Sequence, residues 1–520
     1  MKFFIFYLGL FLFILSSVNA QTYKKEKSKV IKAYRAEQDA ILLMLQVQRD
    51  SIMNLRSESN DEEADSVRQE LIRKNREKYQ SDMARRDSLN RIEYAEILFS
   101  NNPDTIKKIN LRSAAYENYP ERLKLFTNLE TLNLRDNNLT NFAPFFTNLK
   151  QLNFLDLTGN KLGEENPSFE VPKLENIKSL ILEANGLNTL PRGISNNRKL
   201  EELSLSRNQL NNSGKRLKFK KSKSIKKLDL SRNELTRFPK KVKKLKNLES
   251  LNLSRNDIRS LKGIKKLKNL KSLNLSYNSV FIRPKDLKKL KNLETLTLRG
   301  CKLVYIPESI ALLQNLKKLV VPENYLTTLP ESLSQLKKLE SLMLYKNIMD
   351  VLPKVVLSLE SLIWLDIYYN AIKEVPAEIA NLKNLEVLYL SHNKLDRLPA
   401  SIARMPKLKE LYAHNNRIVS LPKEFANLNK LKYLHLQENL LAKFPEFILN
   451  LKKLEELNLA HNQIIAFPQD LLNLKELTLF AVNGNPYENG SKERDHLLQI
   501  LEKLQQRGVI VRFDLNGKEF

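Results

Sequence analysis

Leucine recurs along most of the chain in one pattern, L-x-x-L-x-L-x-x-N-x-L, which predicts a repeated strand and turn. The pattern is clear at 129–139 and 152–162, and a degenerate unit begins one period earlier at Ile106. Sixteen units in register cannot be a chance match. The ninth position of the pattern recurs mostly every 23 residues, at Asn137, Asn160, Asn185, Asn208, Asn233, Asn256, Asn278, Cys301, Asn324, Asn347, Asn370, Asn393, Asn416, Asn439, Asn462 and Asn485.

The physical chemistry of this unit predicts a solenoid of the α/β class over residues 101–487. In the L-x-L segment the leucines alternate with other residues, so a short strand points its leucines inward and the residues between them outward. The asparagine side chain can bond backbone groups in the turn that follows, groups that stacking would otherwise bury unpaired. Because one unit cannot bury its own leucines, neighbours stack at about 4.8 Å into a parallel concave sheet over a continuous core.

The second half of the unit is equally regular. A hydrophobic residue followed by proline precedes an I/L-x-x-L segment, and proline predicts the start of a short helical or 3₁₀ turn on the convex side. This form resembles the 23-residue, Ras-suppressor class of leucine-rich repeat proteins over about residues 106–487. The resemblance implies a horseshoe-shaped leucine-rich-repeat solenoid that works through protein–protein contacts. The proline pairs are Leu329–Pro330, Leu352–Pro353, Val375–Pro376, Leu398–Pro399, Leu421–Pro422, Phe444–Pro445 and Phe467–Pro468.

The two ends of the solenoid differ from its repeats. At 488–520 we expect a C-terminal cap, in which Ser491 begins a helix that runs through Gln506, Gly508 ends it, and 509–515 forms a strand. At 21–100 we expect helices, because apolar residues recur in a heptad frame over 31–55. The N-terminal segment is either a helical hairpin that caps the solenoid or a short dimerising coiled coil, and the oligomeric state stays open.

The first twenty residues have the form of a signal peptide. Lys2 precedes an apolar run over 3–15, and small residues at 16–20 predict cleavage after Ala20, with Gln21 as the mature N-terminus. The apolar run falls short of the ~20 residues that span a membrane. We therefore expect an exported protein that is periplasmic, at the cell surface or secreted. Cys301 is the single cysteine, so no internal disulfide can form, which favours a bacterial setting.

The basic residues are concentrated in one part of the chain. From Lys215 to Lys291 there are 27 Lys and Arg residues against 5 Asp and Glu, a net charge of +22. This excess indicates attraction to an anionic glycan, lipopolysaccharide or lipid, whereas nucleic acid is disfavoured because aromatic residues are not interleaved with the lysines. The candidate polyanion residues, assigned to the convex half-repeat, are Lys240, Lys241, Lys243, Lys244, Lys265 and Lys266.

The sequence contains none of the common catalytic motifs, so we expect neither enzymatic activity nor a cofactor. Cys301 stands at the ninth position of its own repeat, where a buried, unreactive thiol is expected. Four histidines occupy exposed positions in the last repeats. They fall in different columns of the sheet, so we expect no metal site.

The third, fifth, seventh and eighth residues of each unit should face outward from the concave sheet. In early repeats these positions are mostly Ser, Asn, Asp, Thr and Arg, but from the repeat anchored at Asn347 they become aromatic. Because Tyr and Trp dominate interface hot spots, we predict a binding patch for a protein or peptide. The alternative is an envelope or adhesion protein held to anionic polymers by its basic convex face. The predicted concave patch consists of Tyr345, Trp364, Tyr368, Tyr369, Tyr389, His392, Tyr412, His414, Tyr433, His435 and His461.

Overall fold

The computed structural model describes residues 97–98, 102–164, 169–211, 219, 223–239, 241–487, 490–515 and 518–519. The chain divides into two units, Met1–Leu89 and Asn90–Phe520, and the described residues all belong to the second. The predicted signal peptide and nearly all of the predicted helical segment 21–100 lie outside the described residues, as does Lys240. Among the described helices, none is long and apolar enough to cross a membrane.

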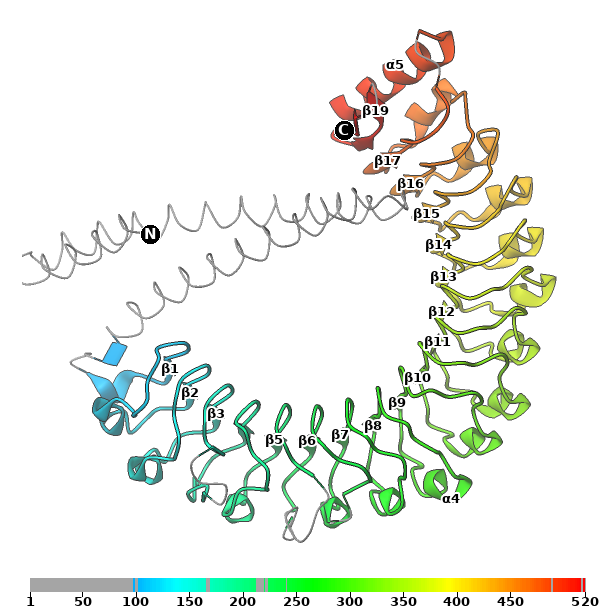
Figure 1. Ribbon diagram of the computed structural model, residues 1–520. Coiled ribbons are helices and arrows are strands. Elements are labelled where there is room, and N and C mark those ends of the chain that lie inside the picture. The colour runs from blue at the N-terminus through cyan, green and yellow to red at the C-terminus, as the bar shows by residue number, and fades with distance from the viewer. Residues whose placement is uncertain are drawn as a thin grey trace, which may run out of the picture. The chain divides into compact units, whose positions relative to one another are not determined.

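The repeats build one parallel sheet of three-residue strands, which confirms the predicted solenoid. The strands stack in chain order along the inner side of an arc (Figure 1). Each pairs with its neighbour one repeat away, as Leu342 does with Leu365. The strands are β1 (Lys108–Asn110), β2 (Thr131–Asn133), β3 (Phe154–Asp156), β4 (Ser179–Ile181), β5 (Glu202–Ser204), β6 (Lys227–Asp229), β7 (Ser250–Asn252), β8 (Ser272–Asn274), β9 (Thr295–Thr297), β10 (Lys318–Val320), β11 (Ser341–Met343), β12 (Trp364–Asp366), β13 (Val387–Tyr389), β14 (Glu410–Tyr412), β15 (Tyr433–His435), β16 (Glu456–Asn458), β17 (Leu479–Ala481) and β18 (Ile510–Arg512).

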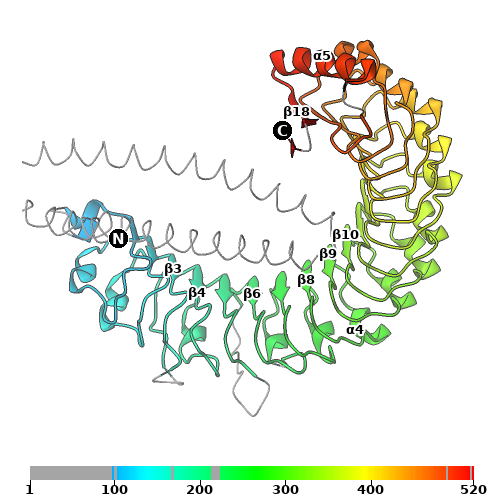
Figure 2. The same cartoon turned by 45° about the horizontal axis from the view of Figure 1, so that its top comes forward.

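The convex side consists of short 3₁₀ helices and one short α-helix, drawn as the outer turns of the arc (Figures 1 and 2). In the later repeats the proline stands immediately before the helix, and its carbonyl accepts the first bond, as Pro330 does from the Leu333 amide at 3.0 Å. This confirms the role predicted for proline. The helices are η2 (Pro103–Thr105), η3 (Glu121–Leu125), η4 (Pro144–Asn148), η5 (Ile194–Asn196), η6 (Val242–Lys244), η7 (Ile264–Lys266), α4 (Pro284–Leu287), η8 (Glu308–Leu312), η9 (Glu331–Gln335), η10 (Lys354–Ser358), η11 (Ala377–Asn381), η12 (Ala400–Arg404), η13 (Lys423–Asn427), η14 (Glu446–Asn450) and η15 (Gln469–Asn473).

The asparagine at the ninth position joins consecutive repeats. The Asn324 side chain accepts hydrogen bonds from the amides of Cys301 and Leu303, both at 2.9 Å. Its amide group donates to the carbonyls of Leu298, Val321 and Pro322 at 2.9, 2.9 and 3.0 Å. One buried side chain thus satisfies backbone groups of two repeats that would otherwise be unpaired in the core.

The C-terminal helix and strand lie where the sequence predicts them. Helix α5 (Lys492–Gln506) begins at Ser491, whose hydroxyl accepts a hydrogen bond from the Arg494 amide at 3.2 Å. Gly508 follows with φ +83°, a left-handed conformation that suits glycine at a helix end. Strand β18 then extends the main sheet beside β17, and β19 (Asp514–Leu515) pairs with β20 (Lys518–Glu519). The buried face of α5 covers the end of the core with Leu497, Ile500, Leu501 and Leu504.

Cys301 is buried at the ninth position of its repeat, as predicted, and burial raises the pKa of its thiol to about 11. The thiol donates to the Leu275 carbonyl at 3.2 Å, the contact that asparagine makes in other repeats. The Asn324 side-chain oxygen accepts a hydrogen bond from the Leu303 amide. The equivalent amide for Cys301 is that of Val280, and the thiol has no oxygen that could accept its hydrogen bond.

We therefore expect Cys301→Asn to be tolerated, with a free energy of unfolding unchanged or raised by about 1 kcal/mol, because the asparagine can add that hydrogen bond. Urea denaturation of the two proteins measures the difference. A loss of more than about 2 kcal/mol would show that the turn has adapted to sulfur.

Candidate functional site

The predicted patch lies on the concave face of the sheet. The central residue of each strand is buried, and its two neighbours are mostly part-exposed toward the inside of the arc, as in the Trp364–Asp366 strand. All eleven predicted residues are partly or well exposed. Strands β12 to β15 provide Trp364, Tyr389, Tyr412, Tyr433 and His435, and the turns after the strands provide Tyr345, Tyr368, Tyr369, His392, His414 and His461.

Four of these side chains form a continuous aromatic column across β12 to β15. The rings of Trp364 and Tyr389 lie 5.4 Å apart, and those of Tyr389 and Tyr412 stack in parallel at 4.3 Å. His435 meets Tyr412 edge-on at 4.9 Å. The register explains the contacts, because Tyr389, Tyr412 and His435 are direct partners on neighbouring strands. Such pairs add about 0.5–1.5 kcal/mol beyond their burial.

The stacking determines which part of each ring a ligand can reach. The Tyr389 and Tyr412 rings differ in plane by only 3°, so each covers a face of the other. The edges and hydroxyl groups remain for contact, and the Tyr412 hydroxyl donates to the Glu410 carboxylate at 3.0 Å. Burial is the main cause that raises the pKa of both tyrosines, which keeps them neutral donors. The column is a rigid ridge rather than a flat aromatic platform.

Four other residues form a second group, the tyrosine–histidine cluster, in the turns after β12 to β14. Tyr368 contacts Tyr369 at 5.6 Å and His392 at 4.9 Å between ring centroids. His392 also lies 5.1 Å from Tyr369 and 5.2 Å from His414. Tyr369 is half exposed, at 51%, and presents the group to solvent. The cluster therefore borders the aromatic column on the same face.

The other three predicted residues contact different neighbours. Tyr345 lies 5.7 Å from the Arg299 guanidinium, and the Tyr433 hydroxyl donates to Glu455 at 3.0 Å. His461 lies beside Asn483, with 3.3 Å between nitrogens. The eleven residues thus form a column, a cluster and three separate positions rather than one uniform patch.

A network in the preceding repeats was missed by the sequence reasoning. Arg299 forms an ion pair with Glu323 at 2.6 Å, and the Tyr277 hydroxyl donates to the same carboxylate at 2.9 Å. The Arg255 guanidinium lies over the Tyr277 ring at 4.3 Å. Tyr277 occupies the eighth position of its repeat, so the aromatic signal begins three repeats earlier than the sequence analysis placed it.

The eighth position has a backbone conformation that constrains its side chain. Residues there have φ near +50°, as in Tyr277, Tyr369 and His392, a left-handed region that costs about 1–2 kcal/mol for a residue with a Cβ. Their side chains lean over the next repeat. A Cβ on Gly300 would lie 2.7 Å from the Tyr277 ring, and one on Gly484 would lie 2.2 Å from His461. At Gly300 and Gly484 the missing Cβ therefore leaves this space to the preceding aromatic ring.

Burial shifts the titration of the charged groups on the concave face. It lowers the pKa of His414 to about 4, although the Asn415 side chain at 2.8 Å opposes the shift. It also lowers the pKa of His392, and that of His435 despite the Glu456 carboxylate at 3.1 Å. Desolvation raises the pKa of Asp366, the strand partner of Tyr389, to about 6. At neutral pH the histidines of the column and of the cluster, His392, His414 and His435, are therefore largely uncharged.

These shifts predict opposite effects of two variants on acid stability. Between pH 6.5 and about 4 the unfolded chain protonates His414 while the folded chain does not, so stability falls as the pH falls. Asp366 acts in the other direction, because the folded chain binds its proton first, near pH 6.

From pH 7 to pH 4.5, the free energy of unfolding should fall less in His414→Gln than in the wild type, by a difference of about 2 kcal/mol. In Asp366→Asn it should fall more than in the wild type. Urea denaturation at both pH values measures the slopes. Slopes equal to that of the wild type would contradict the burial assigned to these groups.

Five of the six basic residues predicted to bind polyanions lie in the described part of the chain, on the convex side and away from this site. Lys243, Lys244, Lys265 and Lys266 belong to η6 and η7, and Lys241 immediately precedes η6. All five are exposed. Within the described part of the chain, no group of three His, Cys, Asp or Glu side chains is placed to hold a metal ion.

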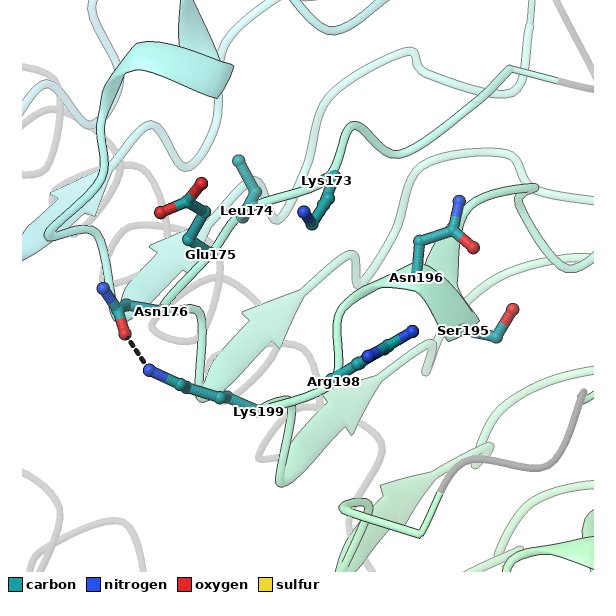
Figure 3. A pocket seen from close by; sticks show the side chains of 8 residues that line it. All are labelled: Lys173, Leu174, Glu175, Asn176, Ser195, Asn196, Arg198 and Lys199. Carbon is teal, nitrogen blue, oxygen red and sulfur yellow. Dashed lines mark hydrogen bonds between the residues drawn. The ribbon is translucent and has the colours of Figure 1, made fainter.

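A surface depression of about 640 Å³ lies between two early repeats (Figure 3). Lys173, Glu175 and Arg198 are among its lining residues, and Lys199 donates to the Asn176 side chain across its edge. These residues precede β4 and β5, seven to eight repeats before the start of the aromatic column at β12. The lining is mostly polar and contains none of the predicted binding residues, so the concave aromatic surface remains the candidate site.

The stacked parallel strands, outer 3₁₀ turns and side-chain-rich inner face define a class of protein, the repeat solenoid with an extended concave surface. The chain belongs to the leucine-rich repeat family. A family model described as a leucine-rich repeat region matches residues 390–513, and further leucine-rich repeat models match 128–149, 196–214, 212–258, 246–283, 338–395 and 360–418. No curated protein matches the chain significantly in sequence.

Solved structures with the same fold support this assignment. The leucine-rich repeat protein LIC12759 of Leptospira interrogans is 32% identical, with 81% of this chain and 98% of that chain covered and a TM-score of 0.65. Toll in the Toll–Spätzle complex of Drosophila is 22% identical over 71% of this chain and 52% of that chain, with a TM-score of 0.57. A TDR receptor is 23% identical over 74% and 65%, with a TM-score of 0.51.

Proposed function

We propose that this protein is a non-enzymatic scaffold that binds a protein or peptide outside the cytoplasm through its concave sheet. The observation that supports the proposal most is the aromatic column over β12 to β15, with the tyrosine–histidine cluster beside it. Rings held by one another lose little freedom on binding, and the core does not need them because each strand already buries its leucine on the other face.

The form of the column favours a polypeptide ligand. Flat stacking of a sugar needs an open ring face, whereas Tyr389 and Tyr412 cover each other. Exposed ring edges, neutral hydroxyl groups and the nearby carboxylates of Glu410 and Glu456 suit a mixed apolar and hydrogen-bonding partner. Structures with this fold include that of the Toll–Spätzle complex of Drosophila. Export rests on the signal-peptide pattern of residues 1–20.

The test is selection followed by mutation. A random peptide library is selected on the full mature chain, and the selected peptide is titrated against that chain and against the variant Trp364→Ala/Tyr389→Ala. Loss of affinity in the variant supports the proposal, and unchanged affinity places recognition on another surface.

The exposed lysines of η6 and η7 favour a second function, attachment to an anionic surface polymer through the convex side. The dependence of binding on salt concentration distinguishes the two functions. Counterion release makes a polyanion contact weaken steeply as ionic strength rises. Binding through the aromatic column should change little between low and high salt.

A further inference from the structure

Three consecutive repeats share the motif L-x-L-Ser-Arg-Asn, at 203–208, 228–233 and 251–256. Their arginines, Arg207, Arg232 and Arg255, follow β5, β6 and β7 at the eighth position of the repeat, on the concave side, and all three are exposed. We call these three residues the arginine ladder. Neither the aromatic column nor the convex lysines include them.

The backbone aligns the ladder. The amide of each arginine donates to the carbonyl of the serine that precedes the eighth position in the next repeat. Arg207 donates to Ser231 at 3.0 Å, Arg232 to Ser254 at 2.8 Å, and Arg255 to Ser276 at 2.7 Å. The three Cα atoms are therefore one strand step apart, about 4.8 Å. The Arg255 guanidinium lies over the Tyr277 ring of the next repeat at 4.3 Å, whereas the Arg207 guanidinium lies beside Glu183 of the preceding repeat.

The ladder is only partly neutralised within the chain. Arg207 pairs with Glu183 at 3.2 Å, but among the described residues neither Arg232 nor Arg255 forms an ion pair. The Asp229 carboxylate is engaged by Ser231 and Asn252 instead. Like charges on neighbouring strands repel, so the two adjacent guanidinium groups destabilise the free protein. Beyond Arg255, the Arg299 charge is already paired with Glu323.

The choice of arginine distinguishes this line from the convex side. Of the 27 basic residues between 215 and 291, 21 are lysine, including those of η6 and η7. General solubility is served by lysine, whereas the planar guanidinium fork matches a carboxylate with two parallel hydrogen bonds. Three consecutive exposed arginines on the concave side therefore offer this fork geometry to an acidic ligand.

We propose that the arginine ladder binds an acidic segment of the polypeptide partner, with its carboxylates on Arg232 and Arg255. This inference rests on the proposed function and deepens it. The ladder ends at β7 and the aromatic column begins at β12, about 24 Å away along one continuous sheet. A single extended partner reaches both, with acidic residues at one end and apolar residues at the other. Between them, β8 carries Ser272 and Asn274, small polar residues that are only part-buried and that suit the backbone of such a partner.

The test uses a fluorescein-labelled hexaglutamate peptide as the probe and fluorescence anisotropy as the readout, with the full mature chain at low ionic strength. The variant Arg232→Gln/Arg255→Gln is compared with Lys243→Gln/Lys265→Gln, which removes the same charge from the convex side. We expect the dissociation constant to rise at least tenfold in the arginine variant and less than twofold in the lysine variant. Arg232→Lys/Arg255→Lys should restore only part of the affinity, because lysine keeps the charge but not the fork.

Equal losses in the arginine and lysine variants, or a larger loss in the lysine variant, would overturn the proposal and show attraction to net charge alone. The proposal would also be overturned if the arginine variant bound a heparin hexasaccharide more weakly but hexaglutamate as tightly as the wild type, with no such loss in the lysine variant. That result would assign the ladder to an anionic glycan. Thermal unfolding by circular dichroism confirms that the variants fold. If the Trp364/Tyr389 variant loses its selected peptide but the ladder variant keeps hexaglutamate, the proposed function stands and this inference fails.

Discussion

Replacing Trp364 and Tyr389 by alanine is expected to weaken binding of a selected peptide by on the order of 2 kcal/mol each, about 30-fold. Trp364 is the only tryptophan in the chain and begins the aromatic column, and Tyr389 joins it to Tyr412. Removing either ring takes away contact area and also frees its neighbour to rotate. The rings of the two residues lie 5.4 Å apart, so the double variant should lose less than the sum of the single losses.

Isothermal titration calorimetry with the selected peptide measures these losses. Tyr305→Ala is the matched control, because Tyr305 is an aromatic residue that is 58% exposed and lies outside the concave strands. The column variants should still fold, with a stability loss of about 1 kcal/mol from the missing ring pairs. Full-strength binding by the double variant would show that recognition lies elsewhere, with the basic convex side as the next surface to test.

Asn324→Ala is expected to lower the free energy of unfolding by about 3 kcal/mol or more, the largest effect on stability predicted for this chain. The substitution removes five hydrogen bonds and leaves the buried amides of Cys301 and Leu303 without their acceptor. It acts on both repeats that the side chain joins. In a solenoid, where each repeat is stabilised by its neighbours, such a loss weakens the coupling between the two parts of the chain.

Urea denaturation followed by Trp364 fluorescence measures the effect close to the substitution, since Trp364 lies on β12 and Asn324 follows β10. Asn315→Ala is the control, because this part-exposed asparagine makes only surface bonds: it donates to the Lys291 carbonyl at 2.9 Å and accepts from the Lys338 ammonium group at 2.7 Å. Its loss should be below about 1 kcal/mol. A similar loss in both variants would mean that the ninth position is replaceable and that the leucine core alone holds the repeats together.

The regular parts of the fold followed from the sequence because each signal lies within one repeat. The leucine and asparagine positions predicted every strand pairing from β2 to β17, and proline predicted the outer turns of the later repeats. Ser491 and Gly508 marked the two ends of α5. The burial of Cys301 followed from its position in the repeat, since stacking places every ninth residue against the next unit.

The candidate site was predictable in position but not in arrangement. Counting positions placed Trp364, Tyr389 and Tyr412 on the concave face, and the structure shows them there. The sequence could not show that the Tyr389 and Tyr412 rings stack while the Tyr433 hydroxyl bonds Glu455. These contacts join residues 22 or more positions apart and depend on side-chain rotations. The network of Tyr277, Arg299 and Glu323 was missed for the same reason.

By itself, the sequence determined the number, register and facing of the repeats, since a 23-residue period and a buried leucine stripe admit only one way of stacking. Only the tertiary structure decided how the exposed side chains pair, which of them lose solvent, and which charges stay unmatched. The low pKa of His414 and the raised pKa of Asp366 arise mainly from burial, and the Arg255 guanidinium lies over the Tyr277 ring of the next repeat. Periodicity specifies where such a neighbour stands, but its conformation depends on packing in three dimensions.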